Sequence, residues 1–264
     1  MKQYGLIGHP LAHSFSRQFF TEKFAREGVD AKYLNFDIES IAQLPQLLEE
    51  HPDLQGFNVT IPYKQQVMQY LDELSDEARE IGAVNVVRVT RQLPNGQLPN
   101  GQLPNGQLPN CPILKGFNSD IIGFMDSIRP LLQPHHRRAL VLGTGGASKA
   151  VCVGLNRLGL EWRYVSRTPR DGQFTYADIT PNMLADYTVI VNCSPLGMSP
   201  RTDSCPELPY RSLTPQHLLY DLVYNPEQTL FMRQGRRQGA TVKNGLEMLH
   251  LQALASWEFW NGKD

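Results

Sequence analysis

Short apolar runs alternate with amphipathic stretches along most of the chain, which is the pattern of an α/β protein. In the first 90 residues, YGLIG (4–8), KYLNFD (32–37) and LQGFNVT (54–60) predict strands. The stretches FFTEKFAREG (19–28) and IAQLPQLLEE (41–50) between them predict helices. Strands and helices in this alternation build a parallel or mixed sheet covered by helices, so we expect a first α/β domain.

A short repeat interrupts this pattern. Helical stretches at 66–71 and 75–81 lead to the strand-like run NVVRV at 85–89, after which three copies of QLPNG and a truncated QLPN fill residues 92–110. A period of five residues is too short for a solenoid, whose repeats need about 20 residues or more. Because Pro-Asn-Gly is turn chemistry, we expect an elongated surface loop that joins two strands. It is either an expanded tip without function or a partner-binding loop.

The remainder of the chain predicts a doubly wound, Rossmann-like unit. PILKGFN (112–118) resumes as a strand, and SDIIGFMDSIRPLL (119–132) has helical periodicity. Residues 246–260 predict a last helix that packs back on the first domain. We therefore expect a first domain of residues 1–118 plus 244–264 and a nucleotide-binding domain of residues 119–243. The runs of this second domain are ALVLGTGG (139–146), WRYVSR (162–167), FTYADI (174–179), TVIVNCS (188–194) and LLYDLVY (218–224), with helices after the first and the third.

The stretch LVLGTGGASKA (140–150) carries the most specific chemistry. An apolar strand runs into a glycine-rich turn and then a helix start, so helix amides and the helix dipole favour a pyrophosphate there. Gly143, Gly145, Gly146 and Ala147 let the backbone approach such a ligand closely. The alternative is a tight strand-to-helix turn that binds nothing.

The end of the next predicted strand distinguishes the two nicotinamide dinucleotides. An NAD site carries an acidic residue there for the ribose 2′-hydroxyl, whereas this chain has Ser166, Arg167, Thr168 and Arg170. A guanidinium and hydroxyls suit a 2′-phosphate, which a carboxylate would repel. The sequence therefore favours NADP over NAD.

Composition excludes several other classes of function. The chain has 264 residues with 25 Lys and Arg against 26 Asp and Glu, so its charge favours neither nucleic acid nor an anionic membrane, and we expect a small-molecule partner. The amino terminus lacks the apolar core of a signal peptide, and no run approaches a membrane span, which predicts a cytoplasmic protein. The four cysteines form no CxxC pair, and His135 and His136 lack acidic or thiol neighbours, so we expect no metal.

Polar residues gather where the predicted strands of the first domain end, which is where open α/β sheets bind ligands. Their hydroxyl, amide, ammonium and carboxylate groups suit a small ligand with several hydroxyls and a carboxylate. Each also has a plainer interpretation: Ser14, Ser16 or Asp120 can cap a helix, and Lys64 can be a solvated lysine. The residues are His13, Ser14, Ser16, Asn58, Thr60, Lys64, Asn85, Asn118 and Asp120.

Taken in order, these motifs resemble the shikimate dehydrogenase family over nearly the whole chain except the repeat. The resemblance implies reversible reduction of 3-dehydroshikimate to shikimate by NADPH, in the biosynthesis of aromatic amino acids. The motifs are HSFS (13–16), NVTIPYK (58–64), GAVN (82–85), GFNSD (116–120), GTGGASKA (143–150), NCSPLGM (192–198), DLVYNPEQT (221–229) and NGLEMLHLQA (244–253).

The resemblance also implies roles for individual residues. By this resemblance the substrate carboxylate binds Ser14, Ser16 and Tyr224, and the ring hydroxyls bind Thr60, Lys64, Asn85, Asp120 and Gln252. By the same resemblance the adenosine phosphate binds Ser166, Arg167, Thr168 and Arg170, and the nicotinamide lies near Met198, Gly245 and Met248. Either methionine can instead be an ordinary core residue. The chain departs from the family pattern at Arg17, Ser119 and Ser166, where proline, threonine and asparagine are usual.

Lys64 and Asp120 form the implied catalytic pair. Hydride addition to a ketone creates an alkoxide that needs a proton and a nearby positive charge, and an ammonium supplies both. A lysine in water releases its proton poorly at neutral pH, and a neighbouring aspartate raises the pKa of the lysine further. Two mechanisms stay open: Lys64 exchanges the proton itself, or it stabilises charge while water relays the proton.

Three other functions compete with this one. A quinate/shikimate dehydrogenase accepts a second substrate and often NAD, but an acidic residue is expected near Arg167 in that case. A non-catalytic NADP-sensing module has no need of both Lys64 and Asp120. A different NADP-dependent α/β enzyme, such as a methylenetetrahydrofolate dehydrogenase, shares the architecture only. Both a monomer and a homodimer are compatible with the sequence.

Overall fold

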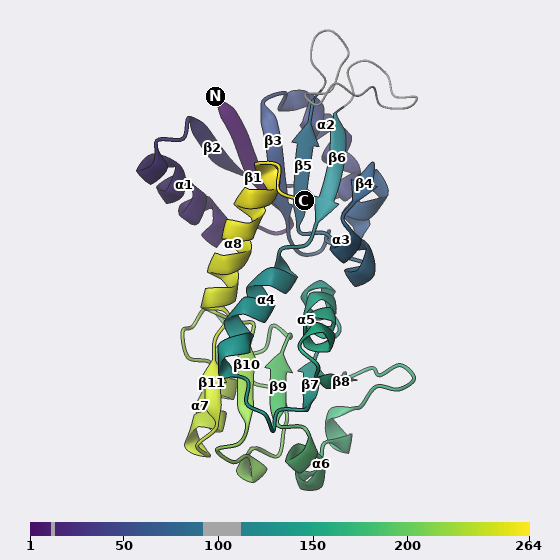
Figure 1. Ribbon diagram of the computed structural model, residues 1–264, viewed down its shortest axis with the longest axis vertical. Coiled ribbons are helices and arrows are strands. Elements are labelled where there is room, and N and C mark those ends of the chain that lie inside the picture. Colours follow the sequence, from purple (N-terminus) through teal and green to yellow (C-terminus); the bar gives the residue numbers. More distant parts are fainter. Residues whose placement is uncertain (12–13, 92–111) are drawn as a thin grey trace. The chain divides into compact units, whose positions relative to one another are not determined.

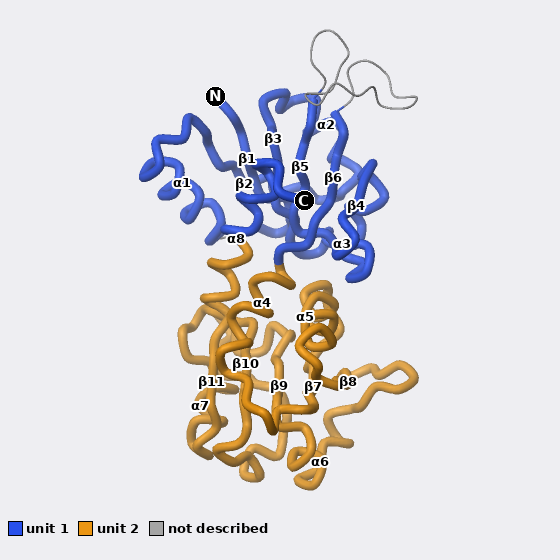
Figure 2. The backbone as a smooth tube through the Cα atoms, viewed as in Figure 1, with its two compact units in different colours: residues 1–119, 253–264 blue, residues 120–252 orange. Residues whose placement is uncertain are grey.

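The computed structural model describes residues 1–11, 14–91 and 112–264, which fold into two compact α/β units (Figure 1). Unit 1 comprises residues 1–119 and 253–264, and unit 2 comprises residues 120–252 (Figure 2). The second division falls inside the last helix, α8 (Leu246–Trp260), whereas the sequence places it before residue 244. The predicted repeat loop at 92–110 lies outside the described residues.

A mixed sheet forms the centre of unit 1. Among the described residues it has six strands in the order β2-β1-β3-β5-β6-β4. β1 pairs in parallel with β2 and β3, and β5 pairs antiparallel with β3 and β6. The two-residue β4 is too short to leave a pattern in the sequence. The strands are β1 (Lys2–Gly8), β2 (Ala31–Asp37), β3 (Leu54–Val59), β4 (Glu73–Leu74), β5 (Val86–Thr90) and β6 (Ile113–Phe117).

The helices of unit 1 begin and end where local chemistry predicts. Ser14 precedes α1 (Phe15–Glu27), which Gly28 ends with a left-handed φ of 64° that favours glycine. Ser75 likewise precedes α3 (Asp76–Ile81), which ends at Gly82. The predicted helix at 41–50 is a 3₁₀ turn, η1 (Ile41–Gln43), followed by α2 (Leu44–Glu50), and the stretch after residue 65 is a second 3₁₀ turn, η2 (Gln66–Tyr70).

Both faces of the unit 1 sheet are covered. Phe20 and Phe24 of α1 pack with Tyr33 and with Trp260 of α8 on one face, and Leu44 and Leu48 of α2 contribute to the core on the other. The Trp260 indole donates to the Val87 carbonyl at 3.1 Å. A Cβ on Gly56 would lie 2.3 Å from the same indole, so only glycine fits there. The last helix therefore returns to the first unit, as the sequence predicts.

Unit 2 is built on a fully parallel sheet. Its described strands follow the order β11-β10-β9-β7-β8, so the chain reverses direction across the sheet between β7 and β9. This is a doubly wound arrangement, and ligands bind such sheets at the point of reversal. The predicted fold class is confirmed. The strands are β7 (Arg138–Leu142), β8 (Glu161–Val165), β9 (Val189–Asn192), β10 (Leu218–Asp221) and β11 (Thr241–Lys243).

Helices pack on both faces of this sheet. One core contains Phe124, Val151 and Met248 from α4, α5 and α8, and the other contains Leu184 and Phe231 from α6 and α7. The run FTYADI forms a 3₁₀ turn (Tyr176–Asp178) rather than a further element of the sheet, and α7 and β11 have no predicted counterpart. The helices are α4 (Asp120–Ile128), which runs on into the 3₁₀ turn η3 (Arg129–Leu131), α5 (Gly146–Arg157), α6 (Pro181–Asp186) and α7 (Leu230–Arg237).

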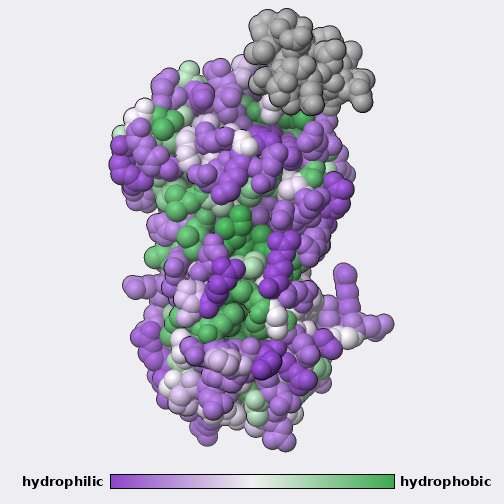
Figure 3. Space-filling model, in the orientation of Figure 1, coloured by the Kyte–Doolittle hydropathy of each residue, from purple (hydrophilic) through white to green (hydrophobic). Residues whose placement is uncertain are grey.

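Most of the surface drawn in Figure 3 is hydrophilic, and hydrophobic side chains gather over the region of α8. Leu246 and Leu254 are exposed residues of that helix. Among the described helices, none combines the length and the apolar character that a membrane crossing needs.

Candidate functional site

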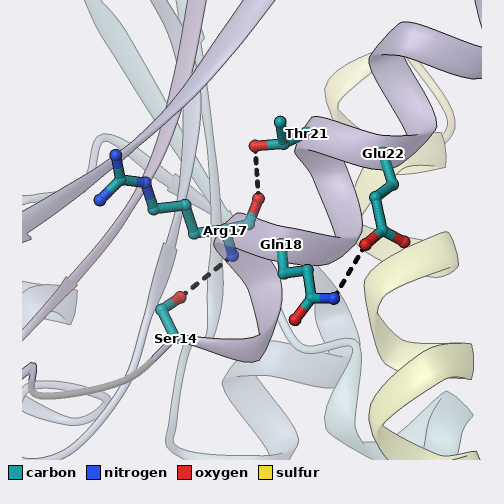
Figure 4. Close-up of a pocket in the computed structure, with 5 residues that line it drawn as sticks. All are labelled: Ser14, Arg17, Gln18, Thr21 and Glu22. Carbon is teal, nitrogen blue, oxygen red and sulfur yellow. Dashed lines mark hydrogen bonds between the residues drawn. The ribbon is translucent and has the colours of Figure 1, made fainter.

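Ser14 caps the first turn of α1, at the carboxyl edge of the unit 1 sheet. Its hydroxyl oxygen accepts a hydrogen bond from the backbone amide of Arg17 at 3.1 Å (Figure 4). The oxygen that accepts this bond still carries a proton that it can donate to a ligand. Capping and ligand binding are therefore compatible at Ser14. A surface cavity of about 340 Å³ opens beside it, lined by Ser14, Arg17, Gln18, Thr21 and Glu22.

Ser16 is the second residue of the same helix and is buried. Burial raises the pKa of the neighbouring Tyr33, and a hydrogen bond with Ser16 lowers it in part. The phenol therefore stays protonated and donates to Oδ1 of Asn58 at 2.9 Å. This bond fixes which way the Asn58 amide faces.

A buried network of amides and hydroxyls continues from Asn58. Its Nδ2 donates to the Asn85 carbonyl at 3.1 Å and to the Ser256 hydroxyl of α8 at 2.9 Å. Asn85 in turn accepts from the Ser119 amide at 2.7 Å and donates to the Ser119 hydroxyl at 3.0 Å. The two serine hydroxyls lie 3.1 Å apart. Asn85, the last residue of the GAVN motif, is thereby held in one orientation.

Thr60 and Lys64 lie in the turn that follows β3. The Thr60 amide donates to the Ile7 carbonyl at 2.9 Å, and the Thr60 carbonyl accepts from the Tyr63 amide at 2.9 Å. The Lys64 carbonyl accepts from the Val84 amide at 2.7 Å, one residue before Asn85. The fold therefore brings Lys64 and Asn85, which belong to separate motifs, to the same edge of unit 1. Lys64 is partly buried.

The glycine-rich turn of unit 2 has room for a ligand. Gly143 has a φ of 101°, which favours glycine, and the loop after β9 packs against it. Gly145 is different: its φ is −72°, and a Cβ built there meets no protein atom within 4 Å. Gly146 and Ala147 begin α5 and direct backbone amides toward the same space. Since neither strain nor packing requires glycine at position 145, the turn fits a phosphate group that approaches the backbone.

Polar groups at the end of β8 fit the 2′-phosphate of NADP. The Thr168 amide donates to the Ser166 hydroxyl at 3.2 Å, which forms a compact turn. Arg167, Thr168 and Arg170 are exposed, and in the part of the chain that the structure describes Arg167 forms no ion pair. A cation that is exposed and unpaired can bind a phosphate without first breaking another interaction.

The remaining candidates of unit 2 differ in exposure. Met198 is 48% exposed and Tyr224 is 37% exposed, whereas Met248 is 7% exposed and packs in the core. Gly245 has no room for a side chain, because a Cβ would lie 2.2 Å from the Leu222 carbonyl oxygen. Burial raises the pKa of Tyr224, so its phenol is protonated and able to donate to a carboxylate.

Asp120 and Gln252 lie on α4 and α8 of unit 2. Asp120 is the first residue of its helix and is 6% exposed, so it lies where the helix dipole stabilises its charge. The sequence allows Asp120 to precede and cap this helix, but the structure includes it in the first turn. The two helices approach closely at Gly123, where a Cβ would lie 2.5 Å from the Met248 carbonyl oxygen and 3.1 Å from Gln252.

A fully buried carboxylate, Asp221, ends β10. Its Oδ1 accepts from Asn192 at 2.9 Å and from the Val223 amide at 3.1 Å, and its Oδ2 accepts from the Thr229 hydroxyl at 2.6 Å. Burial raises the pKa of Asp221 to about 6, although these three hydrogen bonds each lower it. Among the described residues, no group of three or more His, Cys, Asp or Glu side chains is placed to hold a metal ion.

Comparison with known proteins identifies the family. Residues 6–87 match the model of the shikimate dehydrogenase substrate binding domain. The NADP(+) shikimate dehydrogenase of Caldanaerobacter subterraneus subsp. tengcongensis is 34% identical over 284 residues, which cover 99% of this chain and 92% of the relative. The chain belongs to the shikimate dehydrogenase family.

Solved structures of similar proteins agree with this assignment. The shikimate 5-dehydrogenase of Thermus thermophilus, in complex with NADP(H) and shikimate, has a TM-score of 0.80 and 29% identity, and the match covers 100% of this chain and 94% of that chain. The 5-ketofructose reductase of Gluconobacter sp. strain CHM43 has a TM-score of 0.77 and 25% identity, covering 99% and 93%. The shikimate dehydrogenase fold therefore also occurs in a protein named for another reaction.

Each unit also contains buried polar residues that the sequence does not single out. Ser256 lies in an apolar helix pattern and Tyr33 in a strand pattern, so neither differs from a core position until the fold brings it to Asn58. Asp221 and Asn192 belong to motifs typical of the shikimate dehydrogenase family, but nothing in their spacing indicates that their side chains meet. A polar residue within an apolar run is the signal that points to each of them.

We predict that Asp221 makes stability fall as the pH rises. Its folded-state pKa of about 6 lies above the ordinary value of 3.8, so the folded protein holds the proton more tightly than the unfolded chain between these values. The free energy of unfolding contributed by Asp221 should therefore decrease by about 2 kcal/mol from pH 4 to pH 7. Urea unfolding of wild type and Asp221→Asn across this range measures it, because only the wild type titrates at this position. A difference between the two proteins that does not change with pH would contradict the prediction.

Proposed function

We propose that the chain is an NADP-dependent shikimate dehydrogenase that reversibly reduces 3-dehydroshikimate to shikimate in the biosynthesis of chorismate and aromatic amino acids. The observation that carries this proposal is the match to a curated NADP(+) shikimate dehydrogenase along 99% of the chain. It is supported by polar residues at the carboxyl edge of each unit, whose chemistry suits a hydroxylated carboxylic acid in unit 1 and a phosphorylated dinucleotide in unit 2.

In this proposal the substrate carboxylate binds Ser14, Ser16 and Tyr224. Hydroxyls and a protonated phenol donate hydrogen bonds to a carboxylate without adding charge. The ring hydroxyls bind Thr60, Lys64, Asn85, Asp120 and Gln252. The fixed orientation of Asn85 supports its part, because an amide already held by Ser119 presents one hydrogen-bonding pattern to a ligand.

Lys64 and Asp120 carry the proposed chemistry. NADPH, when bound, supplies a hydride to the substrate ketone. Charge then develops on the ketone oxygen, and the Lys64 ammonium stabilises it. The proton that the oxygen needs comes either from Lys64 itself or from water beside it. Asp120 supplies the negative charge of the pair and accepts a hydrogen bond from the substrate hydroxyl.

The proposed cofactor site uses the turn of Gly143, Gly145, Gly146 and Ala147 for the pyrophosphate. Ser166, Arg167, Thr168 and Arg170 hold the 2′-phosphate, and Met198, Gly245 and Met248 border the nicotinamide. Met198 is exposed, which supports a contact with the cofactor. Met248 is buried, so its position gives less support for such a contact.

We also propose that the enzyme works in the cytoplasm as a monomer or a homodimer. The free thiols of Cys152, Cys193 and Cys205 suit a reducing compartment. Size-exclusion chromatography with light scattering distinguishes the two assemblies.

The proposed reaction predicts which substrate and cofactor pair turns over. Formation of reduced nicotinamide is followed by its absorbance, with shikimate or quinate and with NADP⁺ or NAD⁺, in all four combinations. We expect rapid turnover with shikimate and NADP⁺ only. Comparable rates with quinate or NAD⁺ would indicate the broader-specificity relative. Binding of NADP⁺ without turnover of any substrate would indicate a sensor, and reduction of 5-ketofructose by NADPH in place of 3-dehydroshikimate would overturn the proposal.

Replacement of Lys64 should abolish most turnover. We expect Lys64→Ala to lower kcat by at least about 100-fold, because it removes both the charge and the exchangeable proton. Lys32→Ala, at an exposed lysine of β2, is the control and should leave kcat unchanged. The pH profile of Lys64→Arg then separates the two mechanisms, since arginine keeps the charge but does not exchange its proton. Full kcat in Lys64→Ala would remove this residue from the reaction.

Replacement of Arg167 should reduce the preference for NADP⁺. We expect Arg167→Ala to lower kcat/KM for NADP⁺ by about 10- to 100-fold, which corresponds to loss of a charge-assisted hydrogen bond, with little effect on NAD⁺. Arg163→Ala removes an exposed arginine of β8, the strand that precedes Arg167, and should change neither value. An equal loss for both cofactors would mean that Arg167 does not contact the 2′-phosphate.

A further inference from the structure

Three segments of unit 2 that the proposal assigns to the nicotinamide end of the cofactor are bonded to one another. They are the loop after β9, the loop after β10 and the turn at Gly245. The Leu222 amide donates to the Asn192 carbonyl at 2.9 Å, and the Ser199 amide donates to the Asn225 carbonyl at 3.0 Å. Gly245 donates to the Val223 carbonyl at 3.2 Å. Any group that fixes one of these segments therefore influences the others.

Asp221 is bonded to two of these loops. It is 0% exposed, so it touches no solvent and is closed off from a ligand in the solvent-filled part of the site. Its Oδ1 joins the end of β9, through Asn192, to the backbone of Val223, the residue before Tyr224. Its Oδ2 accepts from Thr229, which caps α7.

Asn192 extends this link toward Met198. Its Oδ1 accepts from the backbone amide of Ser194 at 3.0 Å and from the Ser194 hydroxyl at 2.6 Å. Ser194 opens the turn that leads to Met198, and Gly197 of that turn lies against Thr229. A continuous set of hydrogen bonds thus runs from α7 through Asp221 and Asn192 to the loop that carries Met198.

Burying a carboxylate without a cationic partner is unfavourable, because the charged group loses its hydration. Within the described part of the chain Asp221 forms no ion pair, so hydrogen bonds alone offset the loss of its hydration. An apolar residue would pack there at lower cost, but it would leave the Asn192 amide, the Val223 amide and the Thr229 hydroxyl without this acceptor. What the carboxylate contributes is a fixed geometry of the surrounding loops.

We infer that Asp221 is a positioning residue for the nicotinamide end of the cofactor site, acting through Asn192 and Val223 on the loops of Met198 and Tyr224. The inference rests on the proposed NADP function, and it assigns Asp221 no contact with a reactant. Asp221 should influence the nicotinamide end of the cofactor site but not the adenosine end. The adenosine end, at β8, is held by other hydrogen bonds, such as that between Thr168 and Ser166.

Calorimetric titration with two ligands tests the inference. NADP⁺ occupies both ends of the site, whereas adenosine 2′,5′-bisphosphate occupies only the adenosine end. We expect Asp221→Leu to weaken NADP⁺ binding by about tenfold or more, because it removes the oxygen that accepts from Asn192 and Val223, and to leave bisphosphate binding within about twofold of wild type. Thr229→Val is the matched control. It removes one bond to the same carboxylate but leaves Asn192 and Val223 bound, so NADP⁺ should bind nearly as in wild type.

Ser194→Ala keeps the inference testable if Asp221→Leu does not fold. It removes one bond to Asn192 at a partly exposed position, and it should weaken NADP⁺ in the same selective way but less. Equal weakening of both ligands, or of neither, in the folded variants would overturn the inference and leave the proposed function intact. Failure of the wild type to bind either ligand would overturn both.

Discussion

Buried polar groups that must find hydrogen-bond partners hold the ligand-facing loops of both units. In unit 1 the Asn58 amide satisfies its two ends with Tyr33 on one side and Ser256 on the other, and Asn85 is paired in the same way with Ser119. In unit 2 the carboxylate of Asp221 fills the same role between two loops. Because an unsatisfied buried group costs about 1–3 kcal/mol, alternative loop conformations that break these bonds are strongly disfavoured.

The requirement that buried polar groups be hydrogen-bonded fixes the loops around the proposed site, and the proposed reaction depends mainly on such fixed positions. Reduction of a ketone by a nicotinamide requires that substrate hydroxyls, a proton source and the cofactor be held in place, and most of the catalytic gain comes from that arrangement. Among the residues proposed to touch ligands, Lys64 is partly exposed and Met198 is exposed, while Tyr33 and Asp221, which hold neighbouring segments, are buried. In the proposed function, selectivity for one hydroxylated acid rests on buried amides that offer a single hydrogen-bonding pattern.

Much of the fold follows from the sequence, because apolar residues are frequent in long elements such as α8 and run almost without interruption through buried strands such as β7 and β9. The elements without a predicted counterpart are short or highly charged: β4 has two residues, and α7 ends in Arg236 and Arg237. FTYADI looks like a strand by composition, but a Thr175 cap turns it into a 3₁₀ helix. Residues proposed to contact ligands stand in recognisable motifs. The contacts that position them leave no mark in the sequence, since Ser256 and Asn58 are about 200 residues apart and meet only through tertiary packing.

The most direct test of this account is a crystal structure of the protein with NADP⁺ and shikimate bound. The account predicts the 2′-phosphate within hydrogen-bond distance of Arg167, the pyrophosphate on the turn from Gly143 to Gly146, and the substrate carboxylate on Ser14 and Ser16. It also predicts a ring hydroxyl between Lys64 and Asp120, with Asn58 and Asp221 keeping the partners described above. A 2′-phosphate bound away from β8, or shikimate bound away from Lys64, would contradict the account.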